Sequence, residues 1–390
     1  MRDLALMLVL PILLYTGFKR PFIGLGLWLW SSAINLNQIV YGFASSITFA
    51  KLFAAVTILS FFISKEPKST LKYGALTYFI IAFYIIATLS NIGAISNVDL
   101  AWDRWGMLSK IILFYLFAIA IIRKKVHFDF LIWVLIISIG AMSAKEGAKF
   151  LVTGGSHRIP ELPGISGDNN FFGVMILTVI PLAGYILSQT QKKFLKIGVL
   201  TVIFFMVLGI FSTFSRGAFV GLSIFAMSFL KNAKNKVLWG IVLAIIVYAL
   251  MNLMPDAWMD RMNTVEKADK DDSFLTRVAA WKMATLIAMD HILGGGFSCV
   301  ESQFTWDEYS AKFSKLDFIP PLFPPLRFHA THSIYFQVLS GHGFMGLFLF
   351  SMILLMAYFK TSKIASSKNS YPDWAMQLAK MMKLALIVYC

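Results

Sequence analysis

Uninterrupted runs of apolar residues, separated by short polar connectors, dominate this chain of 390 residues. Most runs extend over about 15 to 28 residues, and a helix of roughly 20 apolar residues crosses the hydrocarbon core of a bilayer. Their apolar positions follow neither the 3.6-residue period of a half-exposed helix nor the alternation of a strand. The pattern therefore predicts about twelve transmembrane helices, over residues 4–18, 21–40, 46–64, 73–91, 107–123, 128–146, 168–189, 194–212, 215–231, 236–254, 332–359 and 375–390.

One stretch, residues 255–330, lacks such a run and is expected to lie outside the membrane. Within it, apolar residues from Phe274 to Met289 recur at helical spacing, which predicts an amphipathic helix. The glycines at 294–296 are expected to end this helix, and two proline pairs between 320 and 325 indicate a stiff, extended segment. We therefore expect ten transmembrane helices, one large outer loop and C-terminal transmembrane helices, over residues 1–254, 255–331 and 332–390 respectively.

The basic connectors indicate which side of the membrane each segment faces. Connectors rich in lysine and arginine stay in the cytoplasm. The intervening segments, including residues 255–330, are then expected on the opposite face. The connectors that fix this orientation lie at residues 65–68, 123–125, 192–193, 231–236 and 360–368.

Composition supports a membrane protein and argues against one that binds nucleic acid. Hydrophobic residues make up 58% of the chain and charged residues 14%, whereas a soluble domain has about 25% charged residues. The net charge of +15 comes from the connectors, because residues 255–330 hold 11 acidic and 8 basic residues. No outer domain with a basic face is therefore expected, and we expect no nucleic-acid partner.

Cysteine and histidine contents do not indicate a disulfide framework or a metal centre. Cys299 and Cys390 are the two cysteines, which is too few for a stapled fold. His329 and His332 lie close together in the sequence, but no carboxylate or cysteine stands at ligand spacing from them. We expect no metal and no other cofactor. The glycines that flank His342 favour close helix packing there.

Arg216 is the first candidate for chemistry because it stands between two apolar runs. A charge costs roughly 2.5–3.5 kcal/mol at the membrane centre and less near an interface. One explanation is an interfacial arginine whose guanidinium reaches the lipid headgroups. The other is an anion site, since Ser215-Arg-Gly is expected to open a helix whose amides and dipole favour negative charge.

Further candidates carry groups that suit an anionic substrate. His332 precedes a predicted membrane helix, where a neutral imidazole can accept a proton from a hydroxyl; a structural interfacial histidine is the alternative. Arg277 lies on the predicted amphipathic helix, where a solvated arginine is the alternative. Arg158, Asp168 and Asn169 surround another helix start, where the last two also suit a helix cap. All map to the outer face, which favours a membrane-borne anion such as a lipid phosphate.

Three sequence motifs resemble the O-antigen ligase and polymerase superfamily of bacterial membrane glycosyltransferases. The similarity extends over nearly the whole chain, and the fold it implies is all-α and GT-C-like. The N-terminal Met1-Arg-Asp-Leu, Leu27-Trp-Leu-Trp and Tyr41-Gly-Phe are similar to the branch of O-glycosylation ligases associated with exosortase systems. The three motifs are Thr213-Phe-Ser-Arg-Gly, Arg277-Val-Ala-Ala-Trp followed by Leu293-Gly-Gly-Gly-Phe, and His332-Ser-Ile-Tyr followed by Gly343-Phe-Met-Gly-Leu.

The resemblance implies a metal-independent, inverting transfer at the periplasmic face of the bacterial inner membrane. A glycan leaves undecaprenyl pyrophosphate and joins a hydroxyl of lipid A core, of a growing glycan or of a protein serine or threonine. The corresponding processes are lipopolysaccharide biosynthesis and protein O-glycosylation.

The resemblance also implies roles for individual residues. By position, Arg216 and Arg277 correspond to groups that bind the pyrophosphate, and His332 to the base or acceptor-orienting group. Relatives commonly have an acidic residue where this chain has Gly341, so an acceptor-orienting carboxylate is not implied here. The residues expected to line the site are Arg158, Asn169 and Tyr335.

Two alternatives to a ligase remain open from the sequence. An O-antigen polymerase is the nearer one, because it differs only in the acceptor. A lipid-linked glycan transporter or flippase belongs to a different class, and it would need charges through the membrane midplane and often an internal repeat. The candidates gather on one face instead, which favours a transferase.

Overall fold

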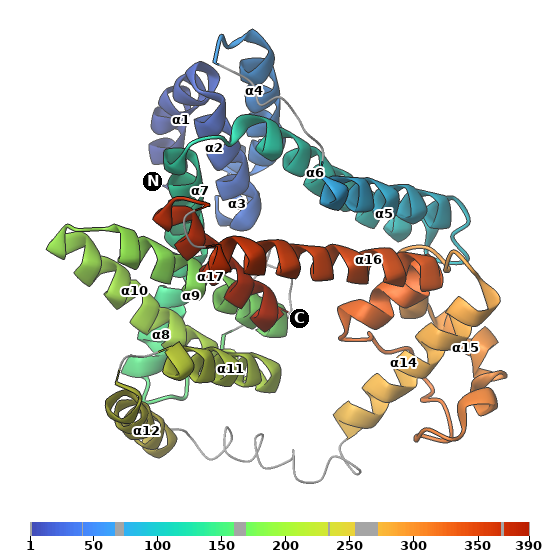
Figure 1. Cartoon of the computed structure of the whole chain (residues 1–390). Coiled ribbons are helices and arrows are strands. Elements are labelled where there is room, and N and C mark those ends of the chain that lie inside the picture. Colours follow the sequence, from blue (N-terminus) through green and yellow to red (C-terminus); the bar gives the residue numbers. More distant parts are fainter. Residues whose placement is uncertain are drawn as a thin grey trace. The chain divides into compact units, whose positions relative to one another are not determined.

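The computed structural model describes residues 2–40, 42–66, 74–159, 169–232, 235–253, 272–367 and 370–389. Over these ranges the chain is helical and contains no strand, as the apolar runs predict (Figure 1). The chain divides into two compact units, each assembled from segments that are distant in the sequence. Unit 1 comprises residues 1–70, 117–260 and 358–390, and unit 2 comprises residues 71–116 and 261–357.

Unit 1 contains most of the N-terminal half of the chain. Within it, the segment Lys125–Val152 is one continuous helical stretch, and its middle, Ile136–Gly140, has π-helical hydrogen bonding. The elements of unit 1 are α1 (Arg2–Lys19), α2 (Pro21–Ala33), α3 (Leu36–Ile39), η1 (Gly42–Ser46), α4 (Phe49–Ile63), α7 (Lys125–Leu135), η2 (Ile136–Gly140), α8 (Ala141–Val152), α9 (Asn169–Gln189), α10 (Lys193–Ser212), α11 (Arg216–Asn232), α12 (Lys236–Leu253) and α17 (Asp373–Tyr389).

Unit 2 combines an antiparallel helix pair with the segment from α14 to η5 and most of a long helix. Side-chain hydrogen bonds join α5 to α6, from Thr77 to Tyr115 at 2.8 Å and from Tyr84 to Ser109 at 2.9 Å. The elements are α5 (Ala75–Ile92), α6 (Val98–Ile121, in this unit up to Leu116), α14 (Asp272–Asp290), η4 (Cys299–Glu301), α15 (Gln303–Ser310), η5 (Phe313–Leu316) and α16 (Ile334–Ser366, in this unit up to Ala357).

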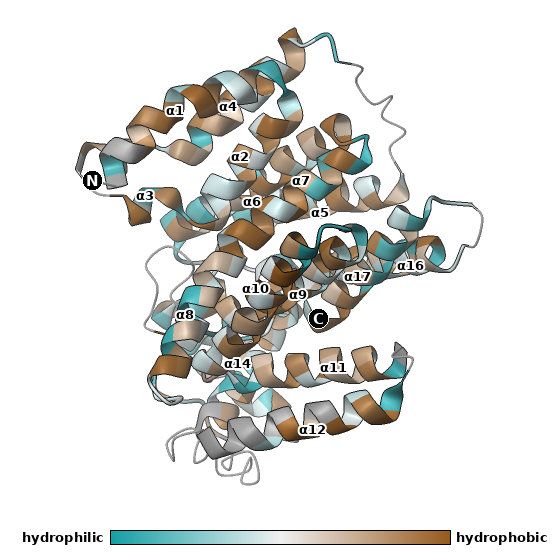
Figure 2. Ribbon diagram, turned by 90° about the vertical axis from the view of Figure 1, so that its left-hand side faces the viewer, coloured by the Kyte–Doolittle hydropathy of each residue, from teal (hydrophilic) through white to brown (hydrophobic). Residues whose placement is uncertain are grey.

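Six helical segments in the described ranges are long and apolar enough to cross a membrane. They are α5, α6, Lys125–Val152, α9, α10 and α16, and they coincide with six of the predicted spans. In Figure 2, hydrophobic residues colour much of α9, α10 and α11, and hydrophilic residues gather where α11 and α12 meet. The other predicted spans, and a single large outer loop over 255–331, stay predictions.

Glycines let α8 and α10 approach each other closely in unit 1. A Cβ atom added to Gly147 would collide with the carbonyl oxygen of Phe205, and one added to Gly209 would collide with the Ser143 side chain. Small residues at helix contacts are typical of membrane proteins. This packing fixes the ends of α8 and α10, from which the first group of candidate residues extends.

The helix predicted over 274–289 is confirmed as α14, but its amphipathic character is not, because residues 278–288 are buried or half-buried on every face of the helix. Its apolar positions, among them Val278, Met283 and Leu286, are buried. Lys282 interrupts the apolar pattern in the sequence, yet only 2% of it is exposed. The helix packs against α15 and η5 around three large aromatic side chains, Trp306, Tyr309 and Phe313.

Candidate functional site

A tight turn between α10 and α11 presents Arg216 at the first position of a helix, as the sequence predicts. Phe214 adopts a left-handed backbone conformation with φ +53°, which reverses the chain. Ser215 then caps α11, because its Oγ accepts a hydrogen bond from the amide of Ala218 at 3.2 Å. The amide of Ser215 in turn donates to Thr213 Oγ1 at 3.2 Å. Arg216 is therefore held beside the positive end of the helix dipole.

Two hydrogen bonds attach other segments of unit 1 to this turn. Ser215 Oγ donates to Asn170 Oδ1, at the start of α9, over 2.6 Å. The amide of Ile159 donates to the carbonyl of Ser212 over 2.9 Å. Arg216, Asn169 and Arg158 are the sequence neighbours of these bonded residues, and Arg158 is exposed. Unit 1 therefore brings these three predicted site residues together, and we name them the unit 1 group. Asp168 lies outside the described residues.

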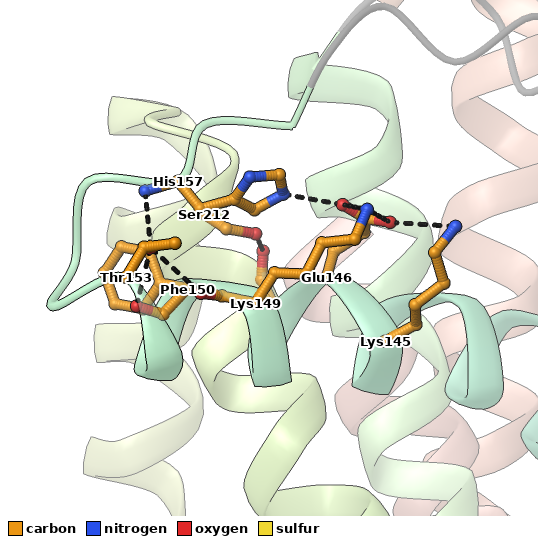
Figure 3. Close-up of polar contacts among 8 residues, drawn as sticks. Lys145, Glu146, Lys149, Phe150, Thr153, His157 and Ser212 are labelled. Atoms are coloured by element: carbon orange, nitrogen blue, oxygen red, sulfur yellow. Dashed lines mark hydrogen bonds and ion pairs between the residues drawn. The ribbon is translucent and has the colours of Figure 1, made fainter.

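A buried carboxylate orders the segment that leads to Arg158 (Figure 3). Glu146, on α8, is 2% exposed, and its Oε2 lies 2.7 Å from Nε2 of His157. Lys149 Nζ and Lys145 Nζ contact its Oε1 at 3.1 and 3.2 Å. Because an ionised carboxylate only accepts hydrogen bonds, the imidazole Nε2–H donates to it. Thr153 Oγ1 accepts the amide of His157 at 3.0 Å, so this histidine is held at both ends.

Sequence reasoning missed the pairing of Glu146 with His157. The contact depends on a chain reversal after α8, where Gly154 and Gly155 have φ +60° and +85° and the amide of Gly155 donates to the carbonyl of Phe150. The available signal was a glutamate in an otherwise apolar run, flanked by lysines one residue before and three residues after it.

Unit 2 positions Arg277 and His332 through one tryptophan. Trp281, one helical turn after Arg277 on α14, donates from Nε1 to the carbonyl of Thr331 at 2.8 Å. Its ring also stacks on Phe336 of α16, with centroids 5.0 Å apart and planes 5° from parallel. Residues four apart share a helix face, so Arg277 lies on the face of α14 that meets the start of α16.

His332 itself has an uncommon backbone conformation. Its φ is +46°, in a region that residues other than glycine adopt rarely and often at functional sites. The residue is exposed, and the neighbouring Thr331 is buried and donates from Oγ1 to the carbonyl of Ser333 at 3.1 Å. Tyr335 follows in the first turn of α16. Unit 2 therefore brings Arg277, His332 and Tyr335 together, and we name them the unit 2 group.

The unit 1 group and the unit 2 group belong to different compact units. That the arginines of both groups and His332 act in one cavity stays a prediction. Among the residues that the structure describes, no three histidine, cysteine, aspartate or glutamate side chains are grouped as metal ligands.

The glycine-rich motifs around residues 294 and 343 have a packing role. Gly295 and Gly296 donate from their amides to the carbonyls of Ser340 and Gly341, at 2.8 and 3.0 Å. Gly343 has φ +66° inside α16, and a Cβ atom there would collide with the carbonyl oxygen of Ile292. The packing around His342 is close, as expected, but the glycines that flank it meet the non-helical segment 292–297 and not a second helix.

Two further side chains complete this contact region. His342 is buried, with Nδ1 2.7 Å from Ser90 Oγ. A Cβ atom on Gly341 would lie 3.3 Å from the carbonyl oxygen of Gly296, which leaves little room for a side chain at this position. Cys299 is buried against the carbonyl of Ser340, and burial raises the pKa of its thiol to about 12.

Comparison with known families finds matches for two segments of the chain. Residues 201–351 match a family described as O-antigen ligase, and residues 1–186 match a family of unknown function. No curated protein and no solved structure matches the chain. The first match includes Arg216 and the whole unit 2 group, and the second includes Arg158 and Asn169.

These matches agree in part with the sequence motifs. They support the O-antigen ligase superfamily and do not test the exosortase-associated branch. Together with the apolar helices, they indicate a multi-pass bacterial membrane protein. The family match also suggests that its substrates are lipid-linked glycans. The chain carries an O-antigen ligase family domain over residues 201–351, which supports a glycosyltransferase of the ligase or polymerase type.

Proposed function

We propose that this protein transfers a glycan from undecaprenyl pyrophosphate to an acceptor hydroxyl at the periplasmic face of the inner membrane. The observation that carries this proposal is the O-antigen ligase match over residues 201–351. The matched segment contains Arg216, Arg277 and His332, and the assignment of all three to one substrate rests on that match. The acceptor is a hydroxyl of lipid A core or of a protein side chain.

The arginines bind the pyrophosphate of the donor. Arg216 supports this role because it stands at the first position of α11, beside amides and a dipole end that favour an anion. A guanidinium also donates two parallel hydrogen bonds to a phosphate. Arg277 supplies the second guanidinium, and Arg158 and Asn169 extend the polar lining. With two guanidinium groups on the leaving pyrophosphate, the developing charge is stabilised without a metal ion.

His332 activates the acceptor, and Tyr335 lines the site beside it. The imidazole takes the proton of the acceptor hydroxyl, and the hydroxyl oxygen attacks the anomeric carbon from the side opposite the pyrophosphate. The bond between that carbon and the pyrophosphate oxygen breaks, and undecaprenyl pyrophosphate leaves with the electron pair. A single displacement of this kind inverts the anomeric configuration.

Transfer by the purified protein in proteoliposomes tests this function. The donor is an undecaprenyl pyrophosphate-linked glycan, and lipid A core, a glycan and an acceptor protein are offered in parallel. Arg216→Ala and Arg277→Ala are each expected to raise the KM for the donor by about 10- to 100-fold, since a hydrogen bond to a charged group contributes about 1.5–3 kcal/mol. Arg20→Ala, at an exposed arginine between α1 and α2, is the matched control.

The acceptor that becomes glycosylated separates the alternatives. Product on the glycan alone identifies a polymerase, and movement of the lipid-linked glycan across the bilayer without product identifies a transporter. Full turnover in both Arg216→Ala and Arg277→Ala would contradict the proposed roles of these arginines, and loss of turnover with a chelator would point to a metal-dependent mechanism.

A further inference from the structure

In unit 2, the loop that follows η5 has large apolar side chains that are exposed on the surface of the protein. Residues 317–328, which we name the proline loop, hold both proline pairs. Leu326 is 93% exposed, Phe323 82% and Phe318 78%. Soluble surfaces rarely gather large apolar side chains this densely, and such patches mark interaction sites. Further exposed apolar residues of the loop are Ile319, Leu322 and Phe328.

The first half of the proline loop is fixed by one side chain of α14, that of Lys282. Lys282 Nζ donates to the carbonyls of Ile319 and Pro321, at 3.1 and 2.9 Å. Its ammonium also lies 3.9 Å from the centre of the Phe313 ring. Burial lowers the pKa of Lys282, and the carboxylate of Asp317 at 3.9 Å opposes this shift. The buried ammonium of Lys282 therefore fixes the first half of the loop through hydrogen bonds to its backbone carbonyls.

Two residues around α15 fix the second half of the loop. Trp306 Nε1 donates to the carbonyl of Pro325 at 2.7 Å. Gln303 donates from Nε2 to the carbonyl of Leu326 at 3.0 Å and accepts the amide of Phe328 on Oε1 at 3.1 Å. The backbone is therefore held from inside while the apolar side chains stay outside.

This construction suits an apolar surrounding. A backbone group that enters hydrocarbon needs a partner within the protein, and the loop carbonyls at 319, 321, 325 and 326 have one. The four prolines contribute no N–H donor. Both features lower the number of unpaired backbone groups that the loop would carry into an apolar surrounding.

The loop also leads directly into a membrane helix. Phe328 is six residues before Ile334, where the span candidate α16 begins, and six residues reach at most about 20 Å. Exposed Lys315 and Arg327 stand at the two ends of the loop, where long cationic side chains can reach lipid phosphates.

We propose that the proline loop inserts its apolar side chains into the boundary between headgroups and acyl chains of the outer leaflet. Lys315 and Arg327 pair with phosphates there, and α14 lies above the membrane surface. The loop is then a second, monotopic membrane contact of unit 2 beside its transmembrane helices. The proposal is independent of the donor and acceptor, because it rests on the loop alone.

Fluorescence quenching in the full-length protein tests this insertion. Cys390 is replaced by serine, and Cys299 remains because it is buried. A single environment-sensitive nitrobenzoxadiazole label is attached at Phe323→Cys, in nanodiscs of zwitterionic and anionic phospholipids. We expect blue-shifted emission, strong quenching by lipids with a nitroxide near the headgroup, and several-fold weaker quenching by iodide than at a water-exposed site.

Two matched positions calibrate the measurement. Glu308→Cys, at an exposed site of α15 away from the Trp306 side, is the aqueous reference, and Phe348→Cys, at an exposed site of α16, is the lipid reference. Leu326→Cys repeats the loop measurement, and neither loop substitution removes a packed side chain.

Two results would overturn the insertion. In the first, iodide quenches both loop labels as strongly as the Glu308→Cys label, which means that the loop lies in water. In the second, both loop labels are protected from iodide and from the nitroxide lipids alike, which means that another protein surface covers the loop.

Discussion

The unit 1 group and the unit 2 group are held by different means. Around Arg216, hydrogen bonds within the turn and its helix cap combine with a bond from Ser215 to Asn170, which is 45 residues away in the sequence. Around His332, the backbone depends on Trp281, which donates to a carbonyl 50 residues away in the sequence. We infer that the geometry of the unit 1 group is shared among several hydrogen bonds around one turn, whereas the geometry of the proposed base is sensitive to the single side chain of Trp281.

Removal of the proposed base is expected to have the largest effect. His332→Ala should lower kcat by about 10²- to 10⁴-fold, the usual contribution of general base catalysis. The KM for the donor should stay close to that of the unchanged protein, because the unit 1 group is intact. An equal loss in KM and kcat would mean that His332 binds the donor, and the contrast between the two groups would fail.

Neutralisation of the buried carboxylate should weaken the unit 1 group. In Glu146→Gln, the bonds to His157, Lys145 and Lys149 lose their charge, and the free energy of unfolding should fall by about 1–3 kcal/mol. The donor KM should rise with it, since His157 directly precedes Arg158. Thermal unfolding and donor titration measure the two effects, and a change in stability without a change in KM would separate this cluster from donor binding.

Trp281→Phe removes one hydrogen bond and keeps an aromatic ring against Phe336. The loss of about 1 kcal/mol from the bond to Thr331 should lower kcat roughly fivefold, because the backbone of His332 is released. Steady-state kinetics should show an unchanged donor KM. An unchanged kcat would show that stacking alone positions His332.

Ser215→Ala is the corresponding change in unit 1. Loss of a helix cap costs about 1 kcal/mol, and the donor KM should rise several-fold while kcat is kept. The opposite responses of Trp281→Phe and Ser215→Ala are the direct test of the comparison. If both variants change the same parameter, Ser215 and Trp281 do not support separate steps of the reaction.

The smallest effect is expected at the end of α14. Lys312 Nζ lies 2.5 Å from Asp290 and holds the pKa of that carboxyl below its usual value. The stabilisation is therefore present above the unfolded pKa of about 3.9 and is lost as the pH falls through the lower folded value. Both side chains are about one-third exposed, so Asp290→Asn should cost about 0–1 kcal/mol. In unfolding curves measured between pH 7 and pH 3, the difference in stability between the unchanged protein and Asp290→Asn should disappear only at the acid end. Glycan transfer should be unchanged in this variant.

Local patterns in the sequence predict much of this structure. The apolar runs predict the positions of the long helices, the periodicity at 274–289 predicts α14, and Ser215-Arg-Gly predicts a helix start. Each of these features depends on residues close together in the chain. Arg216, Arg277 and His332 all lie in the segment that matches the O-antigen ligase family, and their roles stay predictions.

Contacts between distant segments could not be predicted in this way. The bond from His342 to Ser90 spans 252 residues, and no periodicity encodes it. Lys282 has the sequence context of a solvated residue, but the proline loop closes over it and supplies carbonyl partners. The Glu146–His157 pair depends on how two glycines reverse the chain. Such partners follow from the tertiary path of the chain.

The left-handed break at Gly343 has a mechanical consequence. The backbone of Gly295 and Gly296 is bonded to α16 directly before this break, and Trp281 attaches α14 to the first turns of the same helix. The segment that contains α14 and the glycines at 295 and 296 therefore contacts α16, a candidate membrane span, at two points. A change in the tilt of α16, for instance in a thinner bilayer, would therefore move Arg277 and the proline loop together.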